Sequence, residues 1–256
     1  MKYSLCIEPV LEEISFYDRI EKAKELGLDA IEFWDPSVYD TKKIGELAAR
    51  LGLPVACCCL NQAWDYRLNL PFETVRKNFE RSIEFGKDMG CNTFIGLAGD
   101  VSGSGIAQKK LLIENLKRLT EVCEREGVMI VLEALNSLID HKGYYLDSSR
   151  IGFEIVKAVN SPRIKLLFDC YHMQLMEGNL VNNITDNIEW IGHFHSAGVP
   201  GRHELQQGET NYPRIIRAVE DAEYSGYFGL EYWPSYDAVS SIRDTMRYLA
   251  NQEHSF

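Results

Sequence analysis

The chain alternates eight short apolar segments with stretches of helical periodicity, and this rhythm runs through its whole length. We expect strands at residues 3–8, 29–33, 54–60, 92–97, 128–133, 164–169, 189–195 and 227–231. We expect helices at residues 14–26, 42–51, 73–89, 106–126, 149–159, 183–187, 212–222 and 238–249. Gly27, Gly52, Gly90 and Gly127 follow four of these helices, as is typical of helix C-termini. Strands that each precede a helix favour a parallel sheet covered by helices.

The number of repeats predicts a single (β/α)8 barrel, an α/β fold, as one domain over residues 1–256. A chain of 256 residues is within the usual size range of such barrels. A doubly wound open sheet is the alternative, but no GxGxxG sequence follows a predicted strand. No proline- or serine-rich linker interrupts the series, so nothing in the sequence marks a second domain.

The charge balance bears on the class of partner. The 27 Lys and Arg residues against 38 Asp and Glu give a formal net charge of −11. Nucleic acid binding needs a basic surface, so we do not expect nucleic acid as the main partner. A small anionic substrate would have to meet a local cation, either a metal ion or an arginine.

Cysteine usage and the N-terminus give an expectation for the compartment. The chain has 7 cysteines, and Cys57, Cys58 and Cys59 are consecutive, which does not suit a disulfide framework. We therefore expect reduced thiols and a cytoplasmic protein. The first residues do not resemble a signal peptide, and no run of 18 apolar residues predicts a membrane span. Barrels of this kind commonly pair, so we expect a homo-oligomer.

Polar side chains stand at the ends of four successive predicted strands: Glu133, Asp169, His195 and Glu231. The carboxyl ends of barrel strands meet at one mouth, so we expect these four groups to converge. Buried carboxylates are costly unless they are paired or bind a metal. Carboxylate oxygens with one imidazole nitrogen are donors that suit Mg²⁺ or Mn²⁺, whereas the alternative, a zinc site, would be rich in thiolates. We therefore predict a divalent metal site formed by these residues.

Five segments of the second half, within about residues 128–234, carry a family resemblance: LEALN, GYYLDSSR, KLLFDCYHMQLMEGNL, GHFHSAGVPGRHE and GETNYPRI. They resemble the hydroxypyruvate isomerase family, one branch of the xylose isomerase-like barrels that also include ketose 3-epimerases. The runs YHMQLMEG, PGRHE and GETNY are the most specific to this branch. The resemblance implies an isomerase that interconverts hydroxypyruvate and tartronate semialdehyde, or a 2-oxo-tetronate analogue, through a cis-enediolate.

The resemblance also implies roles for individual residues. Glu133 and Glu231 match the proton-transfer pair of the isomerases, and the predicted ligand set matches the metal ligands of the epimerases. His195 departs from the branch, which often has Gln at this position; an imidazole should strengthen metal binding and brings the chain closer to the epimerases. His172 matches a substrate hydrogen-bond donor. Arg202 is expected to bind the substrate carboxylate, because a guanidinium can contact a carboxylate through two hydrogen bonds.

Three further features are interpreted from position alone. Glu209 is expected either to orient Arg202 or to support the site from outside it. His193 shares a strand face with His195; it could support the site from deeper in the barrel or simply pack, and we favour packing. Trp34 and the loop at residues 61–66 follow the second and third strands, where they could wall the pocket or simply pack.

Other functions remain as alternatives. A metal-dependent ketose 3-epimerase or another sugar isomerase would use the same residues. An apurinic endonuclease is more distant, because it needs further histidine ligands and a basic face, and the chain has 6 histidines and a charge of −11. A non-catalytic sugar-binding barrel would gain nothing from two opposed, buried glutamates. Neither a GxSxG sequence nor a Walker A loop is present.

Overall fold

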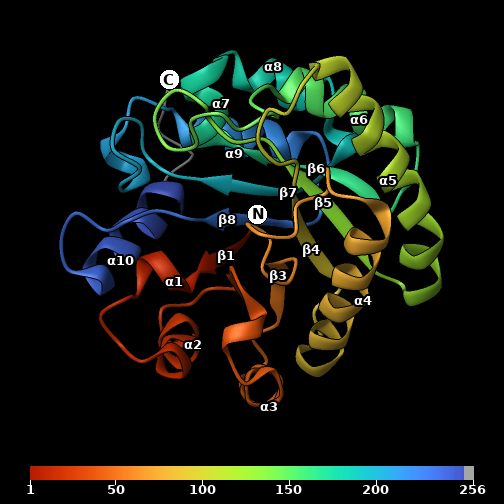
Figure 1. The fold of residues 1–256 in the computed structure, drawn as a ribbon. Coiled ribbons are helices and arrows are strands. Elements are labelled where there is room, and N and C mark those ends of the chain that lie inside the picture. Colours follow the sequence, from red (N-terminus) through yellow and green to blue (C-terminus); the bar gives the residue numbers. More distant parts are fainter. Residues whose placement is uncertain (251–256) are drawn as a thin grey trace.

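Eight parallel strands form a closed barrel in the computed structural model of this chain, which describes residues 1–250 (Figure 1). Each strand pairs with the next, and β8 pairs with β1. The strands are β1 (Lys2–Cys6), β2 (Ala30–Phe33), β3 (Val55–Cys59), β4 (Thr93–Leu97), β5 (Met129–Glu133), β6 (Ile164–Asp169), β7 (Ile191–Ser196) and β8 (Tyr227–Leu230). The closed barrel confirms the predicted (β/α)8 fold and excludes the doubly wound open sheet.

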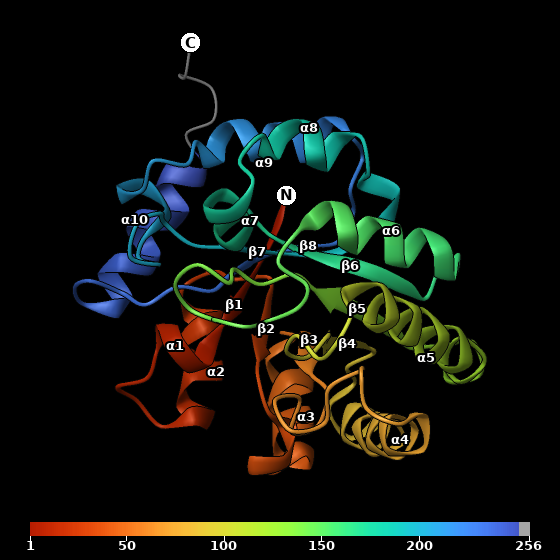
Figure 2. The same cartoon turned by 45° about the horizontal axis from the view of Figure 1, so that its top comes forward.

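Helices surround the barrel on its outside (Figures 1 and 2). They are α1 (Ile7–Val10), α2 (Phe16–Glu25), α3 (Thr41–Leu51), α4 (Phe72–Met89), α5 (Gly105–Glu126), α6 (Ser149–Val159), α7 (Cys170–Met176), α8 (Leu180–Thr185), α9 (Tyr212–Asp221) and α10 (Ala238–Ala250). Short 3-10 turns cover Pro36–Val38, Ile188–Trp190 and Leu205–Gln207.

Glycine ends three of the long helices, as the sequence predicts. Gly52, Gly90 and Gly127 adopt the left-handed conformation, with φ of 58°, 69° and 70°, directly after α3, α4 and α5. A side chain at such a position would strain the backbone, which glycine avoids. Each helix therefore ends where the chain must turn back toward the next strand.

The connection between β6 and β7 differs from the prediction. The sequence predicts one short helix at residues 183–187, whereas the structure has two helices there, α7 and α8. The side chain of Asp169 accepts hydrogen bonds from the backbone N–H groups of Tyr171 and His172 and so begins α7 directly at the strand end. Because Asp169 both ends β6 and caps α7, no loop separates the strand from the helix. The sequence pattern did not indicate this direct connection.

The inside of the barrel has an apolar side and a polar side. Residues from four successive strands, β3 to β6, form a small buried cluster that is separate from the main core: Cys57, Ile95, Val131 and Leu167. The main core lies mostly between the strands and the helices. On β1, β2 and β7, the buried polar residues Ser4, Glu32 and His193 lie within contact of one another through Glu32. Buried polar groups need hydrogen-bond partners, and Glu32 is that partner for both Ser4 and His193.

All seven cysteines are free thiols, and six of them are buried. In the part of the chain that the structure describes, none of the helices combines the length and apolar character needed to cross a membrane.

Candidate active site

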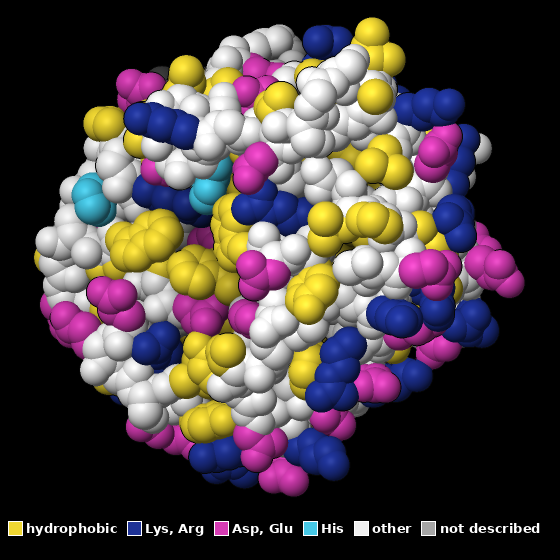
Figure 3. Space-filling model, viewed as in Figure 1, with side chains coloured by type: hydrophobic (Ala, Val, Ile, Leu, Met, Phe, Trp, Pro, Cys, Tyr) yellow, Lys and Arg dark blue, Asp and Glu magenta, His cyan; other side chains and the backbone are white. Residues whose placement is uncertain are grey.

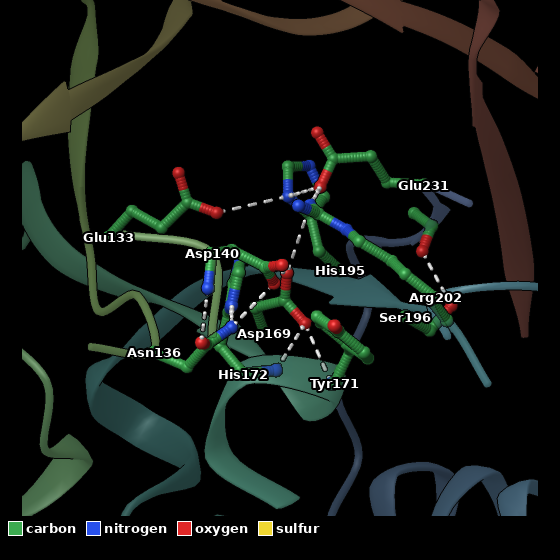
Figure 4. Close-up of polar contacts among 12 residues, drawn as sticks. Glu133, Asn136, Asp140, Asp169, Tyr171, His172, His195, Ser196, Arg202 and Glu231 are labelled. Carbon is green, nitrogen blue, oxygen red and sulfur yellow. Dashed lines mark hydrogen bonds and ion pairs between the residues drawn. The ribbon is translucent and has the colours of Figure 1, made fainter. Parts of the chain in front are cut away.

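Four side chains from neighbouring strands converge at the carboxyl end of the barrel. Glu133 and Asp169 end β5 and β6, His195 lies near the end of β7, and Glu231 directly follows β8. One ligand atom of each lies within 4.8 Å of those of the others, and all four residues are buried. Figure 4 shows the carboxylates of Glu133 and Glu231 reaching toward the same side of the His195 ring from opposite directions. The structure thus brings together the four groups that the strand ends predicted.

The imidazole of His195 is the centre of this cluster. Its Nδ1 lies 3.3 Å from Oε1 of Glu133 and 3.4 Å from Oε2 of Glu231. Burial alone would lower the pKa of His195, but the carboxylates around it, Glu231 and Glu32 first among them, hold that pKa well above its usual value. The cluster therefore attracts positive charge strongly.

Asp169 is the most buried of the three carboxylates, with 1% of its side chain exposed. Burial raises the pKa of Asp169 to about 7, even though Arg202 and His195 oppose that shift. A carboxyl group with such a pKa is only half ionised near neutrality. It would be held as a carboxylate more firmly by a cation in the site.

Arg202 supplies one cation to the cluster from the loop between β7 and α9. Its guanidinium pairs with Glu231 and lies 3.9 Å from Oδ2 of Asp169. The rings of Tyr171 and Trp233 lie 5.2 Å and 4.9 Å from the guanidinium carbon. Burial opposes ionisation of Glu231, but His195 and Arg202 more than offset it and keep the pKa of Glu231 below its usual value. The Nε atom of Arg202 is buried and has no partner among the described residues.

The loop that carries Arg202 is anchored by Glu204. Its buried carboxylate accepts hydrogen bonds from the backbone N–H of Ser235 at 2.9 Å and from the Ser235 hydroxyl at 2.7 Å. Arg202 itself has a φ of 60°, which is unusual for a residue other than glycine. The contacts of Glu204 with Ser235 thus anchor the loop, and the conformation of the loop directs Arg202 into the site.

His172 lies at the start of α7 and is fully buried. Asn136 fixes its protonation. The Asn136 oxygen accepts the backbone N–H groups of Ile139 and Asp140, so its amide nitrogen faces Nδ1 of His172 at 2.6 Å and must donate. Nδ1 is therefore an acceptor and Nε2 carries the proton. Burial holds the pKa of His172 well below its usual value, so the ring stays neutral. Among the described residues the Nε2 group has no hydrogen-bond partner, although a buried N–H is normally paired; it lies 3.5 Å from Oδ2 of Asp169.

A cavity of about 260 Å³ opens above these residues. Figure 3 shows hydrophobic side chains gathered around a hollow, with acidic side chains among them. The apolar lining consists of Trp34, Cys59, Trp64, Ile95, Leu97, Leu135 and Trp233. The polar lining consists of Glu133, His141, His172, His195, Arg202 and Glu231. Trp34 also donates a hydrogen bond from Nε1 to Oε1 of Glu231 at 2.7 Å, so it orients that carboxylate as well as walling the cavity.

The structure does not bring every predicted residue to the cavity. Glu209 is exposed, lies outside the lining and accepts a hydrogen bond from Gln174 at 3.4 Å. His193 is buried as expected, but it is more than a packing residue, because its Nε2 lies 3.0 Å from Glu32. Sequence reasoning missed Glu32, Asn136 and the pocket residue His141. Asn136 lies in the LEALN segment, and its position just past the predicted strand end was the one available signal.

The donor set fits a divalent metal ion. Three carboxylates and one imidazole nitrogen lie close enough together to share one ion, and Arg202 is a neighbouring side-chain cation. Oxygen-rich sites with one nitrogen suit Mg²⁺ or Mn²⁺. Glu133, Asp169, His195 and Glu231 would hold the ion.

Comparison with known proteins identifies the family of the chain. A family model described as xylose isomerase-like TIM barrel matches residues 20–252. The hydroxypyruvate isomerase of Escherichia coli (strain K12) is 26% identical, over 95% of this chain and 97% of that protein. The 2-oxo-tetronate isomerase of Cupriavidus necator is 30% identical, over 91% of this chain and 93% of that protein.

Solved structures are similar as well. The crystal structure of an AP endonuclease, family 2, from Brucella melitensis has a TM-score of 0.90 at 25% identity, and the match covers 96% of this chain and 98% of that one. A D-psicose 3-epimerase from Clostridium cellulolyticum H10 has a TM-score of 0.78 at 19% identity, and the match covers 98% of both chains. The second likeness concerns the fold alone.

Proposed function

Because the chain belongs to the xylose isomerase-like TIM barrel family, and within it to the hydroxypyruvate isomerases and their relatives, we propose that it isomerises a short 2-oxo hydroxy acid. The candidate reactions are hydroxypyruvate to tartronate semialdehyde and the equivalent conversion of a 2-oxo-tetronate. One observation carries the proposal. Two buried carboxylates, Glu133 and Glu231, approach the same imidazole nitrogen from opposite sides at 3.3 Å and 3.4 Å.

Opposed carboxylates suit a proton transfer between adjacent carbons. In hydroxypyruvate, one glutamate would remove a proton from the carbon that bears the hydroxyl group, which gives a cis-enediolate. A proton is then returned to the neighbouring carbon, the former carbonyl carbon, while the hydroxyl proton moves to the former carbonyl oxygen. No electron acceptor is needed, because one carbon is oxidised as the other is reduced.

Two further residues would hold the substrate. The Nε2–H of His172, which makes no hydrogen bond to the described residues, can donate to a substrate oxygen without any rearrangement of Asn136 behind it. The unpaired Nε–H of Arg202, which is itself held by Glu231, can meet the carboxylate of the substrate. The apolar wall formed by Trp34, Trp64 and Trp233 would limit the access of water to the reacting carbons.

A divalent ion, Mg²⁺ or Mn²⁺, would supply charge neutralisation for the enediolate. The four buried groups would then hold it with fewer protons than they carry on their own, since metal ligands must be deprotonated. Glu133 and Glu231 would serve both as ligands and as the proton-transfer pair.

A ketose 3-epimerase is the second candidate. The observation that favours it is His195, an imidazole at a position where the hydroxypyruvate isomerases often have Gln. Epimerisation needs the same two opposed carboxylates, with the proton returned to the same carbon from the other face. We do not extend the AP endonuclease name of the Brucella melitensis protein to this chain, because a net charge of −11 opposes the binding of a phosphate backbone.

Proton NMR in D₂O tests the proposal directly. The protein is stripped with a chelator, and hydroxypyruvate is then added with and without restored Mn²⁺ or Mg²⁺. Conversion that depends on the ion, with solvent deuterium in the product, supports an enediolate and a metal-dependent site. Conversion that is unaffected by stripping would support the glutamate pair but contradict the proposed need for a metal ion. If hydroxypyruvate is not converted, free ketoses are the next substrates, and their epimerisation would replace the isomerase proposal.

A further inference from the structure

A further buried carboxylate, Glu32 on β2, lies inside the barrel beside the candidate active site. Only 1% of Glu32 is exposed, and it is absent from the cavity lining. It accepts hydrogen bonds from Oγ of Ser4 at 2.5 Å and from Sγ of Cys57 at 3.0 Å. Its Oε2 atom also lies 3.0 Å from Nε2 of His193 and 2.8 Å from Nε2 of His195. Side chains from three other strands therefore surround one carboxylate that substrate cannot touch.

A glycine on β8 leaves the space for this contact. Gly229 pairs in register with Ser4 on one side and with His195 on the other. A Cβ atom at Gly229 would lie 2.5 Å from Oε1 of Glu32 and 2.8 Å from Cδ2 of His195. Carbon atoms do not approach other atoms that closely, so any larger residue would displace the carboxylate, the imidazole or both. The Glu32–His195 contact is thus built into the packing of three strands.

The contact determines how His195 faces the active site. A neutral imidazole has one N–H donor and one nitrogen lone pair. An ionised carboxylate only accepts, so Nε2 of His195 must carry the proton when it contacts Glu32. Once a bound ion displaces the proton of Nδ1, the lone pair lies on Nδ1, which is the nitrogen that faces Glu133 and Glu231.

We propose that Glu32 is a positioning residue that fixes the ring orientation and tautomer of His195 for metal binding. The inference rests on the proposed metal site and extends it to a residue outside the cavity. A carboxylate behind a ligating histidine raises the basicity of the ligand and holds the ring at the correct angle. Replacing such a residue typically lowers metal affinity about 10- to 100-fold.

The same groups could instead form a second metal site, since Glu32, Cys57, His193 and His195 also cluster within 4.8 Å. The geometry favours the positioning role. Glu32 already meets each of the other three at a hydrogen-bonding distance of 2.8–3.0 Å, with a proton between each pair. An ion would have to displace all of these protons from a place that is closed to solvent.

Binding of Mn²⁺ alone, without substrate, tests the inference. Free Mn²⁺ is counted by electron paramagnetic resonance during titration of the wild type, Glu32→Gln, His195→Gln and the double variant. Cys57→Ser is the matched control, because it alters another partner of Glu32 and leaves His195 unchanged. We expect Glu32→Gln to bind about 10- to 100-fold more weakly. The control should stay within about twofold of the wild type, and Glu32→Gln should add less than about twofold in the His195→Gln background.

Several outcomes overturn the inference. Glu32→Gln within about twofold of the wild type would do so, as would an equal loss of affinity in the His195→Gln background. A second bound equivalent that Cys57→Ser abolishes would identify a metal site in place of a positioning residue. A wild type that binds no Mn²⁺ refutes the proposed metal site and this inference together, whereas failure of the variants alone refutes only the inference.

A measurement on the wild type covers the case in which Glu32→Gln does not fold. Nitrogen-15 NMR of the Mg²⁺-loaded protein reports which nitrogen of His195 carries the proton. We expect the proton on Nε2. A proton on Nδ1 would overturn the inference without any substitution.

Discussion

Replacing Arg202 tests whether its positive charge offsets the negative charge of the buried carboxylates. Its guanidinium pairs with Glu231 and lies 3.9 Å from Asp169, and the three side chains are 12%, 5% and 1% exposed. Replacement by methionine keeps most of the aliphatic stem between Tyr171 and Trp233 but removes the charge. The carboxylates are then left with His195 as their neighbouring cation.

The expected loss of stability follows from this burial. Removing one partner of a buried ion pair typically costs 3–5 kcal/mol, and we take about 3 kcal/mol because His195 remains. For a chain of this length, about 1 kcal/mol corresponds to a Tm change of roughly 2–4 °C. Arg202→Met should therefore lower the Tm of the metal-free protein by roughly 6–12 °C. A bound divalent ion supplies the missing charge, so most of this loss should disappear in Mn²⁺.

The assay is thermal unfolding in chelator and in saturating Mn²⁺, at pH 8, where Asp169 with its pKa of about 7 is mostly ionised. Arg67→Met is the matched control. Arg67 pairs at 2.6 Å with Asp100, which is 62% exposed and lies outside the cluster, so its effect should be small and independent of metal. An Arg202→Met variant that loses the same Tm with and without Mn²⁺, or that loses none in chelator, would refute this account of the cluster.

Three other predictions concern the same site. Glu133→Gln and Glu231→Gln should each lower kcat by about 10²- to 10⁴-fold; Tm should hold or rise in Glu133→Gln, which removes one of several crowded carboxylates, and fall in Glu231→Gln, which removes the partner of Arg202, and normal turnover in either variant would contradict the proton-transfer role. Mn²⁺ at about 100 times its Kd should stabilise the wild type by about 2.7 kcal/mol, visible as a higher Tm in calorimetry, and an unchanged Tm would argue against a metal site. Burial opposes ionisation of Glu204, but hydrogen bonds from Ser235 keep its pKa below the usual value, so it stabilises the fold above its unfolded pKa and this contribution is lost as the pH falls through the folded pKa. Glu204→Gln should therefore flatten the acid limb of a stability–pH curve, and an unaltered limb would contradict the role of the anchor.

The sequence could predict the fold and the polar groups at the strand ends because both depend on local pattern. Glu133, Asp169, His195 and Glu231 each follow an apolar run, and barrel geometry alone brings such positions together. The position of Arg202 was predicted as a cavity residue, but its pairing with Glu231 was not, since it depends on a loop held from behind by Ser235.

The residues that the sequence did not predict share a physical property: their roles depend on contacts with distant parts of the chain. Glu32 is one acidic residue within an apolar strand, AIEF, and its partners come from β1, β3 and β7. Nothing local distinguishes it from a strand residue that faces solvent. Asn136 matters through two backbone N–H groups that fix its amide, and such contacts appear only once the loop after β5 has a conformation.

The order of the strands separates two tasks along the chain. The last four strands carry the groups proposed to move protons and hold the ion, whereas Trp34, Cys59, Trp64, Ile95 and Leu97, on or just after β2 to β4, contribute much of the apolar wall. Changes in the first half of the gene can therefore reshape what fits in the cavity while the reactive half is inherited intact. Glu32 and Trp34 set the limit of this freedom, because they reach across from the first half to hold His195 and Glu231. We therefore expect that mutation, or exchange of half-barrels between relatives, can change the substrate preference as long as the Glu32–His195 and Trp34–Glu231 contacts are kept.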